Sequence, residues 1–156
     1  MEFLPVNLDG SLEMCISFRR DAHIISYGSD DTFDPNSVKK WYKKLSNKLD
    51  GAGFYHVVHD GEIVGQLEFV SGLSDSRGEL YGYIYLIYLK LDFRNQGLGL
   101  ELQEFMFSIF KSDSCKYVEL RYLPENVQGK QFYKKHGWQD VGQVGSRGQL
   151  SVKRLI

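Results

Sequence analysis

The chain lacks several features that would place it in a class at once. No stretch of it reaches 18 consecutive apolar residues, so nothing in it reads as a transmembrane helix. Residues 1–7 have neither the basic nor the apolar region of a signal peptide. The formal net charge of −1 gives the whole molecule no attraction for nucleic acid or an anionic membrane. These absences predict a cytoplasmic protein without a nucleic-acid or membrane partner.

Cysteine is also scarce. The two cysteines, Cys15 and Cys115, lie far apart in the chain and do not have the spacing of metal ligands. Two such residues do not make a disulfide framework, which agrees with free thiols in a reducing compartment. The sequence also shows no Ser/His/Asp or Cys/His arrangement of the kind that activates a nucleophile. We therefore expect no metal site and no nucleophilic triad.

What the chain does contain is enough apolar surface for a folded core. Of its 156 residues, 42% are hydrophobic and 14% are aromatic, which argues against disorder. No repeat, linker or low-complexity segment interrupts the pattern. We expect a single domain over residues 1–156.

The order of predicted elements favours a mixed α/β, or α+β, fold. Apolar residues at helical spacing predict a helix over residues 35–49, with Asp34 as its N-cap and Pro35 at its first position. Two alternating segments are predicted strands joined by Asp60-Gly61, a dipeptide typical of two-residue hairpin turns. The strands expected are Phe54–His59, Glu62–Val70, Tyr83–Leu89, Lys116–Tyr122 and a closing strand or hairpin over Gln143–Ile156, and a further short helix is expected over Leu12–Arg20. Such an order indicates a mostly antiparallel sheet.

The most informative stretch is Arg94–Gly99, Arg-Asn-Gln-Gly-Leu-Gly, which separates a predicted strand from a predicted helix. Its glycines let the backbone approach a ligand, and the N–H groups of the first helical turn have no partner within the helix. Together these features make an anion site. The dinucleotide fingerprint is incomplete because Leu102 stands where its third glycine would be, and the Walker Gly-Lys-Ser/Thr is absent. The stretch predicts a phosphate or pyrophosphate ligand, with a plain strand-to-helix turn as the alternative.

A second motif follows at Asn126–Trp138, Asn-Val-Gln-Gly-Lys-Gln-Phe-Tyr-Lys-Lys-His-Gly-Trp. The two motifs together resemble the GNAT superfamily of acyl-CoA-dependent N-acyltransferases. The acyl-CoA motif of that superfamily is Arg/Gln-x-x-Gly-x-Gly/Ala, and its later helix is Asn-x-x-Ala-x-x-Phe-Tyr-x-x-x-Gly-Phe. Gly129 replaces the usual alanine and Trp138 the usual phenylalanine. The order and spacing agree, and the resemblance covers about residues 54–155.

The resemblance implies the fold of this superfamily, a central, mostly antiparallel, splayed sheet flanked by helices, with acetyl-CoA as co-substrate and no metal. It implies that backbone groups of Ile87, Tyr88 and Leu89 pair with the pantetheine arm. The pyrophosphate is expected at main-chain N–H groups of the glycine turn, with the Arg94 side chain nearby. The turn residues concerned are Asn95, Gln96, Gly97, Leu98, Gly99 and Leu100.

Two residues of the second motif match functional positions of the superfamily. Tyr133 matches the tyrosine that acts as general acid toward the departing CoA thiolate, and its alternative role is core packing beside Phe132. Asn126 matches a position that contacts the cofactor or a bound water. An asparagine there is equally suited to cap the helix that follows.

The general base is where the sequence departs from the superfamily. Some members have a glutamate eleven residues before the motif arginine, but Tyr83 stands there in this chain. Others use the glutamate of a Glu-Val-Arg segment, which Glu119 in Glu-Leu-Arg resembles. Glu68 on the preceding strand is a third candidate. Either glutamate could instead be a solvated surface side chain, and a water chain could replace a dedicated base.

The resemblance implies an N-acetyltransferase in which a primary amine attacks acetyl-CoA directly in a ternary complex. The alternative is a non-catalytic acyl-CoA sensor on the same scaffold, and a nucleotide-binding regulator is a third hypothesis. The acceptor, a small-molecule or peptide amine, has no motif in the sequence, and a homodimer is an option. Residues that could line the acceptor pocket, or belong to the core, are Tyr27, Phe33, Trp41 and Tyr83.

Overall fold

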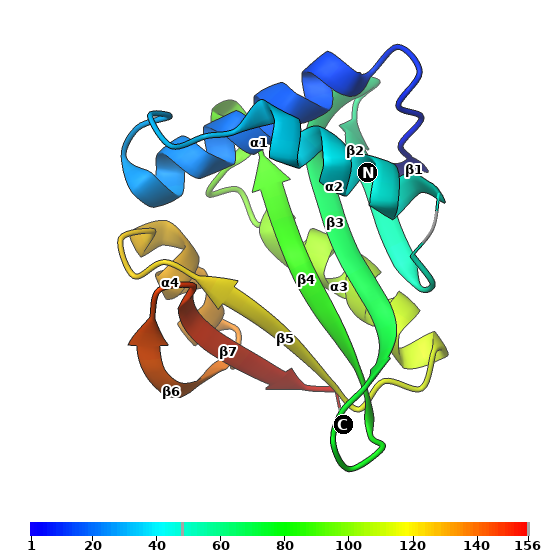
Figure 1. Ribbon diagram of the computed structural model, residues 1–156, viewed down its shortest axis with the longest axis vertical. Coiled ribbons are helices and arrows are strands. Elements are labelled where there is room, and N and C mark those ends of the chain that lie inside the picture. The colour runs from blue at the N-terminus through cyan, green and yellow to red at the C-terminus, as the bar shows by residue number, and fades with distance from the viewer. Residues whose placement is uncertain (48, 156) are drawn as a thin grey trace.

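The computed structural model describes residues 1–47 and 49–155, which form a mixed α/β structure (Figure 1). The strands are β1 Glu2–Pro5, β2 Ala52–His59, β3 Glu62–Ser74, β4 Leu80–Leu89, β5 Tyr117–Tyr122, β6 Gln139–Gly145 and β7 Gly148–Arg154. The α-helices are α1 Leu12–Tyr27, α2 Pro35–Asn47, α3 Leu98–Ser112 and α4 Val127–Lys135, and a 3₁₀ turn covers Leu91–Phe93. No helix in this described part is both long and apolar enough to cross a membrane.

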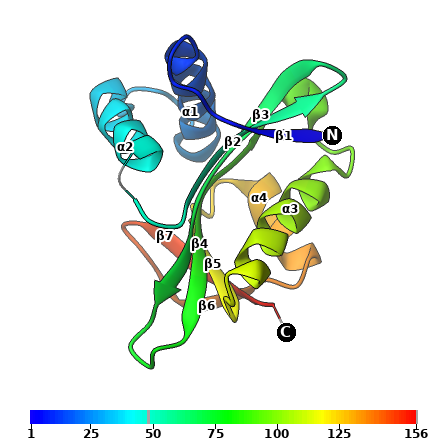
Figure 2. The ribbon, with the colours of Figure 1, turned by 90° about the vertical axis from the view of Figure 1, so that its right-hand side faces the viewer.

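All seven strands form one sheet in the order β1-β2-β3-β4-β5-β7-β6. Every neighbouring pair is antiparallel except β4 and β5, which are parallel because α3 crosses over between them. Helices α1 and α2 cover one face of the sheet, and α3 and α4 lie on the other (Figure 2). This arrangement confirms the predicted α+β fold with a mostly antiparallel sheet.

The sheet splays open between its two parallel strands. β4 pairs with β5 only from Tyr81–Ile84, opposite residues 117–120. Past this point the register between β3 and β4 shifts, so that Glu68 faces Leu86 and Phe69 faces Ile84, which leaves Tyr85 as an extra residue in a β-bulge. A bulge bends its strand, and among the described residues the second half of β4 has β3 on one edge and no strand on the other. The divergence of the two strands in Figure 1 confirms the splayed sheet that the resemblance implied.

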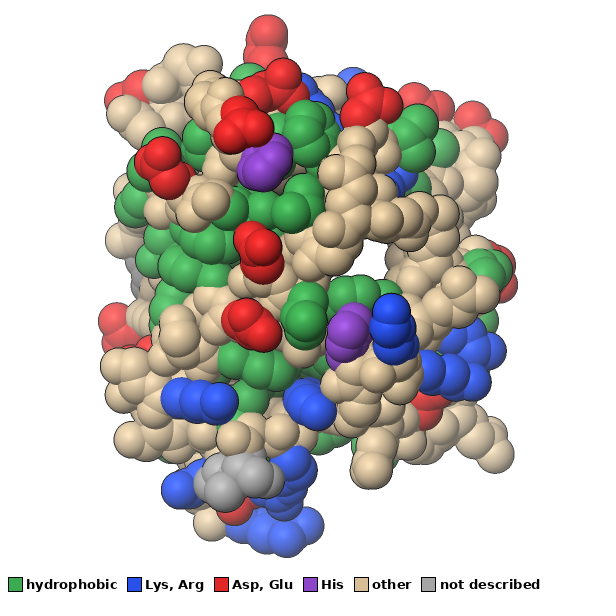
Figure 3. Space-filling model, turned by 180° about the vertical axis from the view of Figure 1, so that it is seen from behind, with side chains coloured by type: hydrophobic (Ala, Val, Ile, Leu, Met, Phe, Trp, Pro, Cys, Tyr) green, Lys and Arg blue, Asp and Glu red, His purple; other side chains and the backbone are tan. Residues whose placement is uncertain are grey.

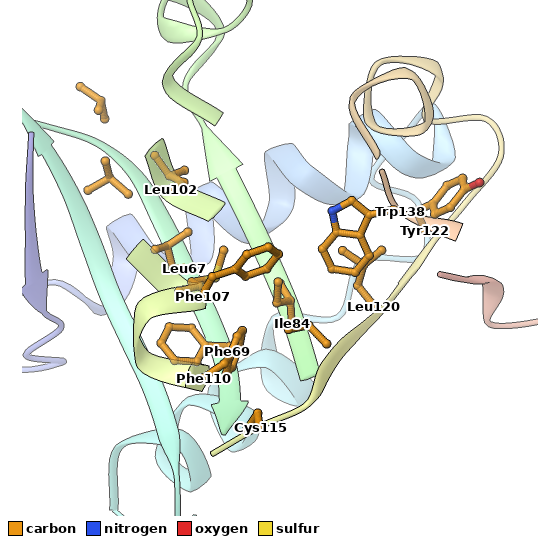
Figure 4. Close-up of a cluster of buried hydrophobic side chains, with 14 residues drawn as sticks. Leu67, Phe69, Ile84, Leu102, Phe107, Phe110, Cys115, Leu120, Tyr122 and Trp138 are labelled. Atoms are coloured by element: carbon orange, nitrogen blue, oxygen red, sulfur yellow. The ribbon is translucent and has the colours of Figure 1, made fainter. Parts of the chain in front are cut away.

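The main core lies between the sheet and α3. Phe69, Leu102 and Phe110 are fully buried there, and Trp138 closes the cluster beside α4 (Figure 4). Gly82 allows this close packing, because a Cβ at its position would lie 2.4 Å from the Phe110 ring. A second core fills the space under α1 and α2. The sheet is therefore held from both faces, which fixes the two strands that diverge.

Most predicted elements are confirmed, with differences at their ends. Asp60 and Gly61 have φ angles of 51° and 79°, as a two-residue hairpin turn requires. The N-terminal helix continues to Tyr27, seven residues beyond its predicted end at Arg20, and ends at Gly28, whose left-handed conformation lets its N–H donate to the carbonyl of Ile24. The C-terminal segment is the hairpin β6–β7. The predicted ends of this hairpin and of the helix over 35–49 include Ile156 and Lys48, which lie outside the described residues.

Strand β1 was not predicted. It has only four residues, too few for an alternating pattern of apolar and polar side chains to be recognised. It ends at Pro5, which has no N–H to donate to a neighbouring strand. Its pairing with β2 at the edge of the sheet, rather than a local preference, makes it a strand.

Candidate active site

A cleft of about 1120 Å³ opens where β4 and β5 diverge. Segments on both faces of the sheet line the cleft. On one face these are α1 and the loop that follows it, and on the other face α4. In Figure 1 the loop that joins α1 to α2 and the end of β5 beside α4 lie on either side of the gap between the diverging ends of β4 and β5. Figure 3 shows the molecule from behind, where the surface is hollowed and basic side chains gather along the lower edge of the hollow.

The glycine turn forms one end of this cleft. Gly97 is the N-cap of α3 and has a φ of +80°, a left-handed conformation that strains any residue with a side chain. Asn95 is also left-handed, with a φ of 61°. Of the predicted anion-site residues, Asn95, Gly97, Gly99 and Leu100 line the cleft. Gln96 and Leu98 are not among its lining residues.

Gly99 is required for a different reason than Gly97. A Cβ at position 99 would lie 3.0 Å from Cε2 of Phe132 in α4, closer than side chains normally approach. The missing side chain therefore lets α4 pack against the first turn of α3. The two glycines together leave the first N–H groups of α3 open to the cleft, where an anion is favoured by unpaired donors and the helix dipole.

Arg94 is fixed in place rather than free. Its Nε donates to the carbonyl oxygen of Leu89 at 2.7 Å, and its guanidinium lies 3.0 Å from the carboxylate of Asp21 in α1. The Tyr88 hydroxyl donates to the same carboxylate. The three side chains thus connect α1, the end of β4 and the glycine turn. No local pattern in the sequence predicts these contacts.

The second half of β4 lines the cleft with the predicted residues Ile87, Tyr88 and Leu89. Since these residues pair with β3 on one edge and have no strand on the other, backbone groups there are open to an extended ligand. The carbonyl of Leu89 already accepts from Arg94. The edge can therefore hold a ligand in the manner of an added strand.

Tyr133 lies in α4 and faces the cleft. Its ring packs at 5.4 Å from that of Tyr122 and 5.7 Å from that of Trp138, so it belongs to the edge of the main core and to the cleft at once. Within residues 1–47 and 49–155 its hydroxyl makes no hydrogen bond. Burial, with the neighbouring Tyr122, raises the pKa of this hydroxyl to about 12. A phenol with this pKa keeps its proton at neutral pH.

Asn126 caps α4. Its side-chain oxygen accepts from the N–H of Gly129 at 3.1 Å, and the residue also lines the cleft. A Cβ at Gly129 would lie 2.7 Å from the Asn126 amide nitrogen, so the cap packs closely on the first turn of the helix. The capping role is confirmed, and the amide group is placed to reach a ligand as well.

The two candidate bases occupy different environments. Glu119 of β5 lies beside Tyr83 in the β4–β5 pair and is half-buried, and burial raises the pKa of its carboxyl above the ordinary range. Glu68 of β3 is fully buried. Its carboxylate accepts from Trp41 Nε1 at 2.8 Å and lies 3.3 Å from the guanidinium of Arg19. Neither glutamate lines the cleft itself, and Glu68 is enclosed by its partners.

The fold brings a cysteine and a histidine together, a contact that the sequence did not predict. Cys15 Sγ lies 3.4 Å from Nε2 of His56, and both residues are buried under α1. Burial raises the pKa of the Cys15 thiol to about 11 and lowers that of the His56 ring. Both groups are therefore held neutral, and the pair is a buried structural contact rather than a nucleophile with its base. Forty-one positions separate the two residues, so the sequence alone did not show it.

Three of the four aromatic residues predicted for an acceptor pocket, Tyr27, Phe33 and Tyr83, line the cleft, and we call the part of the cleft that they line its acceptor end. Trp41 is not among the lining residues, since its indole donates to Glu68. Sequence reasoning missed the charged side chains of this region. These are Arg19, Asp34, Arg121 and Arg147, which come from four separate segments. Each is unremarkable in its own segment, and only the fold collects them.

A splayed seven-stranded sheet with helices on both faces and a glycine-capped helix at the opening is the fold of the acyl-CoA-dependent acetyltransferases. The chain belongs to the Acetyltransferase (GNAT) family, which it matches over residues 14–138. It is 27% identical over 132 residues to an uncharacterised N-acetyltransferase of Lactobacillus delbrueckii subsp. lactis, covering 78% of this chain and 75% of the relative.

Solved structures share the fold at low identity. The PaiA N-acetyltransferase of Thermoplasma acidophilum, in complex with coenzyme A, superposes with a TM-score of 0.77 at 17% identity, over 98% of each chain. The ribosomal-protein-alanine N-acetyltransferase of Brucella melitensis gives a TM-score of 0.73 at 13% identity, over 99% of each chain. Proteins named for such different roles share this architecture, so the acceptor has to be inferred from the residues of this cleft.

Proposed function

We propose that the protein transfers the acetyl group of acetyl-CoA to a primary amine by direct attack in a ternary complex. The observation that carries this proposal is a single cleft that contains three features. These are the open edge of β4, the N-terminus of α3 and the hydroxyl of Tyr133. Family membership supports acetyl transfer, and the coenzyme A in the PaiA structure supports the choice of co-substrate.

The residues present fit coenzyme A. An extended amide-bearing arm is matched by the open edge of β4 at Ile87 to Leu89, and a pyrophosphate by the N–H groups that follow Gly97. The fixed Arg94 guanidinium lies between these two regions. Acetyl-CoA, when bound, supplies a thioester carbonyl for an amine to attack.

The acceptor amine must lose its proton before it attacks. A lysine-like amine has a pKa of about 10.4, so its neutral form costs roughly 4–5 kcal/mol at pH 7 without a base. We assign this task to Glu119, acting through water, because burial raises the pKa of its carboxyl and it lies beside Tyr83, which lines the cleft. Glu68 is the weaker candidate, because Trp41 and Arg19 already engage its carboxylate.

Tyr133 has the second proton task. Its hydroxyl is protonated at neutral pH, faces the cleft and makes no hydrogen bond within the described residues, so it is available to protonate the departing sulfur. Its ring is held by Tyr122 and Trp138, which fixes the direction of the oxygen. A sensor that only bound acyl-CoA would have no use for this acid.

The test is thiol release from acetyl-CoA with a panel of primary amines, run beside thermal unfolding with coenzyme A. Release that depends on the amine supports the transferase. Stabilisation by coenzyme A without release for any amine would replace it with the acyl-CoA sensor. An absence of both effects would mean that the protein does not bind acyl-CoA.

A further inference from the structure

Two arginines in the acceptor end of the cleft are without partners in the part of the chain that the structure describes. Arg121 lies near the end of β5 and Arg147 in the turn between β6 and β7. Both side chains are exposed and both line the cleft. Within residues 1–47 and 49–155, neither guanidinium has a carboxylate within 4.0 Å or donates a hydrogen bond.

The other two arginines that line the cleft are each paired with a carboxylate. Arg19 lies 3.3 Å from the buried carboxylate of Glu68, and Arg94 lies 3.0 Å from that of Asp21. The contrast separates two kinds of arginine within the same cleft. Arg19 and Arg94 hold the structure together, whereas Arg121 and Arg147 present their charge to whatever enters.

Two acidic groups of this region, Asp34 and Glu119, form no ion pair with the two free arginines in the described structure. Asp34 lines the cleft, but its carboxylate accepts from the Ser37 hydroxyl at 2.7 Å and from the N–H of Asn36 at 3.0 Å. Glu119 shares a strand face with Arg121, two residues away, yet forms no ion pair with it in the described structure. Of these four groups, Arg121, Arg147 and Asp34 line the cleft, and neither arginine is paired with a carboxylate in the described structure.

Tyr83 lies where the two charges converge. Burial raises the pKa of its hydroxyl, Tyr85 and Glu119 add to that rise, and the positive charges of Arg121 and Arg147 oppose it. Tyr83 pairs with Glu119 across β4 and β5, two residues before Arg121, and Tyr83, Arg121 and Arg147 all line the cleft, so two arginines from different elements face the same part of it. Two guanidinium groups facing one point suit a bidentate anion.

We propose that the acceptor amine also carries an anionic group, a carboxylate or a phosphate, which Arg121 and Arg147 bind. The inference rests on the proposed acetyl transfer and specifies its substrate. Glu119 and Arg121 lie on one face of β5, so the same strand would present a base to the amine and a cation to the anion. Polycationic acceptors such as polyamines would be repelled by the same pair.

The experiment compares matched acceptors in the thiol-release assay. Free amino acids are paired with their amides, and phosphoethanolamine with ethanolamine, and spermidine and kanamycin serve as polycations. We expect kcat/KM to be about 10- to 100-fold higher for the anionic member of at least one pair, the range of a charge-assisted contact. The amino-acid pair tests the carboxylate and the ethanolamine pair the phosphate. An amide amine deprotonates more readily than that of the parent acid, so basicity alone would favour the amide.

Variants locate the effect. Arg121→Gln and Arg147→Gln should each lower kcat/KM for the anionic acceptor about tenfold or more and leave its neutral counterpart nearly unchanged. Arg77→Gln, in the exposed turn between β3 and β4 and outside the cleft, is the matched control and should change neither. Equal rates within every pair, or a preference for the polycations, would overturn the inference and leave acetyl transfer standing. Release with no amine at all would overturn both.

Discussion

Tyr133 shows at the scale of one residue how packing can define a chemical role. Its ring is part of the aromatic cluster with Tyr122 and Trp138, while its oxygen faces the cleft. The two interpretations that the sequence left open, a core residue and an acid, are therefore compatible. Burial keeps the hydroxyl protonated well above neutral pH, so the residue can donate a proton and is a poor base.

Replacing Tyr133 by phenylalanine removes the oxygen and keeps the ring. We expect turnover to fall by about 10²–10⁴, the usual contribution of one positioned acid, while the affinity for acetyl-CoA stays within a few-fold. Steady-state kinetics and calorimetry measure the two quantities on the same preparation. Wild-type turnover in this variant would assign Tyr133 to the core alone.

Glu119→Gln tests the base through pH. The rate should fall most below the pKa of the amine and recover in part at high pH, because a base matters only while the acceptor holds its extra proton. In the wild type, the acid limb of kcat/KM should lie above the ordinary glutamate pKa of about 4.3, since burial raises the pKa of this carboxyl. An equal loss at every pH would instead indicate structural damage.

Stability supplies the control for that variant, and its sign follows from the direction of the shift. A carboxyl whose pKa is raised by folding is deprotonated at a cost in the folded state, so its contribution becomes unfavourable as pH rises from the unfolded pKa through the folded one. Glu119→Gln should therefore melt at the same temperature as the wild type, or slightly higher, at pH 7. The difference should vanish at pH 3. A lower melting temperature at pH 7 would show that the carboxylate stabilises the fold.

At the scale of elements, the sequence predicted what local patterns encode. Alternation and the Asp60-Gly61 turn gave the β2–β3 hairpin, and the glycine turn gave the start of α3. The features that the sequence did not predict depend on contacts between residues far apart in the chain. β1 exists through pairing with β2, and the link of Asp21 to Arg94 joins residues 73 positions apart. No local preference specifies either contact.

Gly99 connects two elements and offers a graded test. Gly99→Glu places a carboxylate among the first N–H groups of α3, so coenzyme A affinity should fall at least about tenfold through charge repulsion. Gly99→Ala is the matched steric control, because its Cβ meets Phe132 at 3.0 Å but adds no charge. Both variants should lose some stability, about 1 kcal/mol for an overpacked contact of this kind.

Calorimetric titration with coenzyme A and with adenosine separates the two effects of Gly99. The glutamate variant should lose far more affinity for coenzyme A than the alanine variant, and both should bind adenosine as weakly as the wild type. Equal losses in the two variants would mean that packing against α4, and not an anion at the helix N-terminus, sets the affinity.

At the scale of the whole molecule, the cleft is built on a buried polar layer beneath α1 and α2. Glu68 is fully buried at its centre, with Arg19, Trp41 and Gln66 as partners. The sequence predicted the glycine turn and the α4 motif because each is contiguous. It could not predict this layer or the arginines of the acceptor end, because their members come from separate elements and meet only in the folded chain.

Arg19→Met should destabilise the protein by about 3 kcal/mol, because it leaves the buried carboxylate of Glu68 without its cation. Arg20→Met is the matched control in the same helix. The pair of Arg20 with Asp30 spans 3.9 Å between exposed side chains, so its loss should change stability by about 0.5 kcal/mol or less. Urea unfolding measures both. Equal effects would show that Glu68 does not depend on Arg19.

The most direct measurement counts free thiol before and after an amine is added to the protein mixed with acetyl-CoA. Both cysteines of the protein are buried and should add little to the thiol that is counted. Direct attack by the amine predicts no release of coenzyme A thiol in the first phase and continuous, amine-dependent release in the second. One equivalent of thiol per protein before the amine would reveal an acyl-enzyme and contradict direct attack. No release after any amine would contradict acetyl transfer itself.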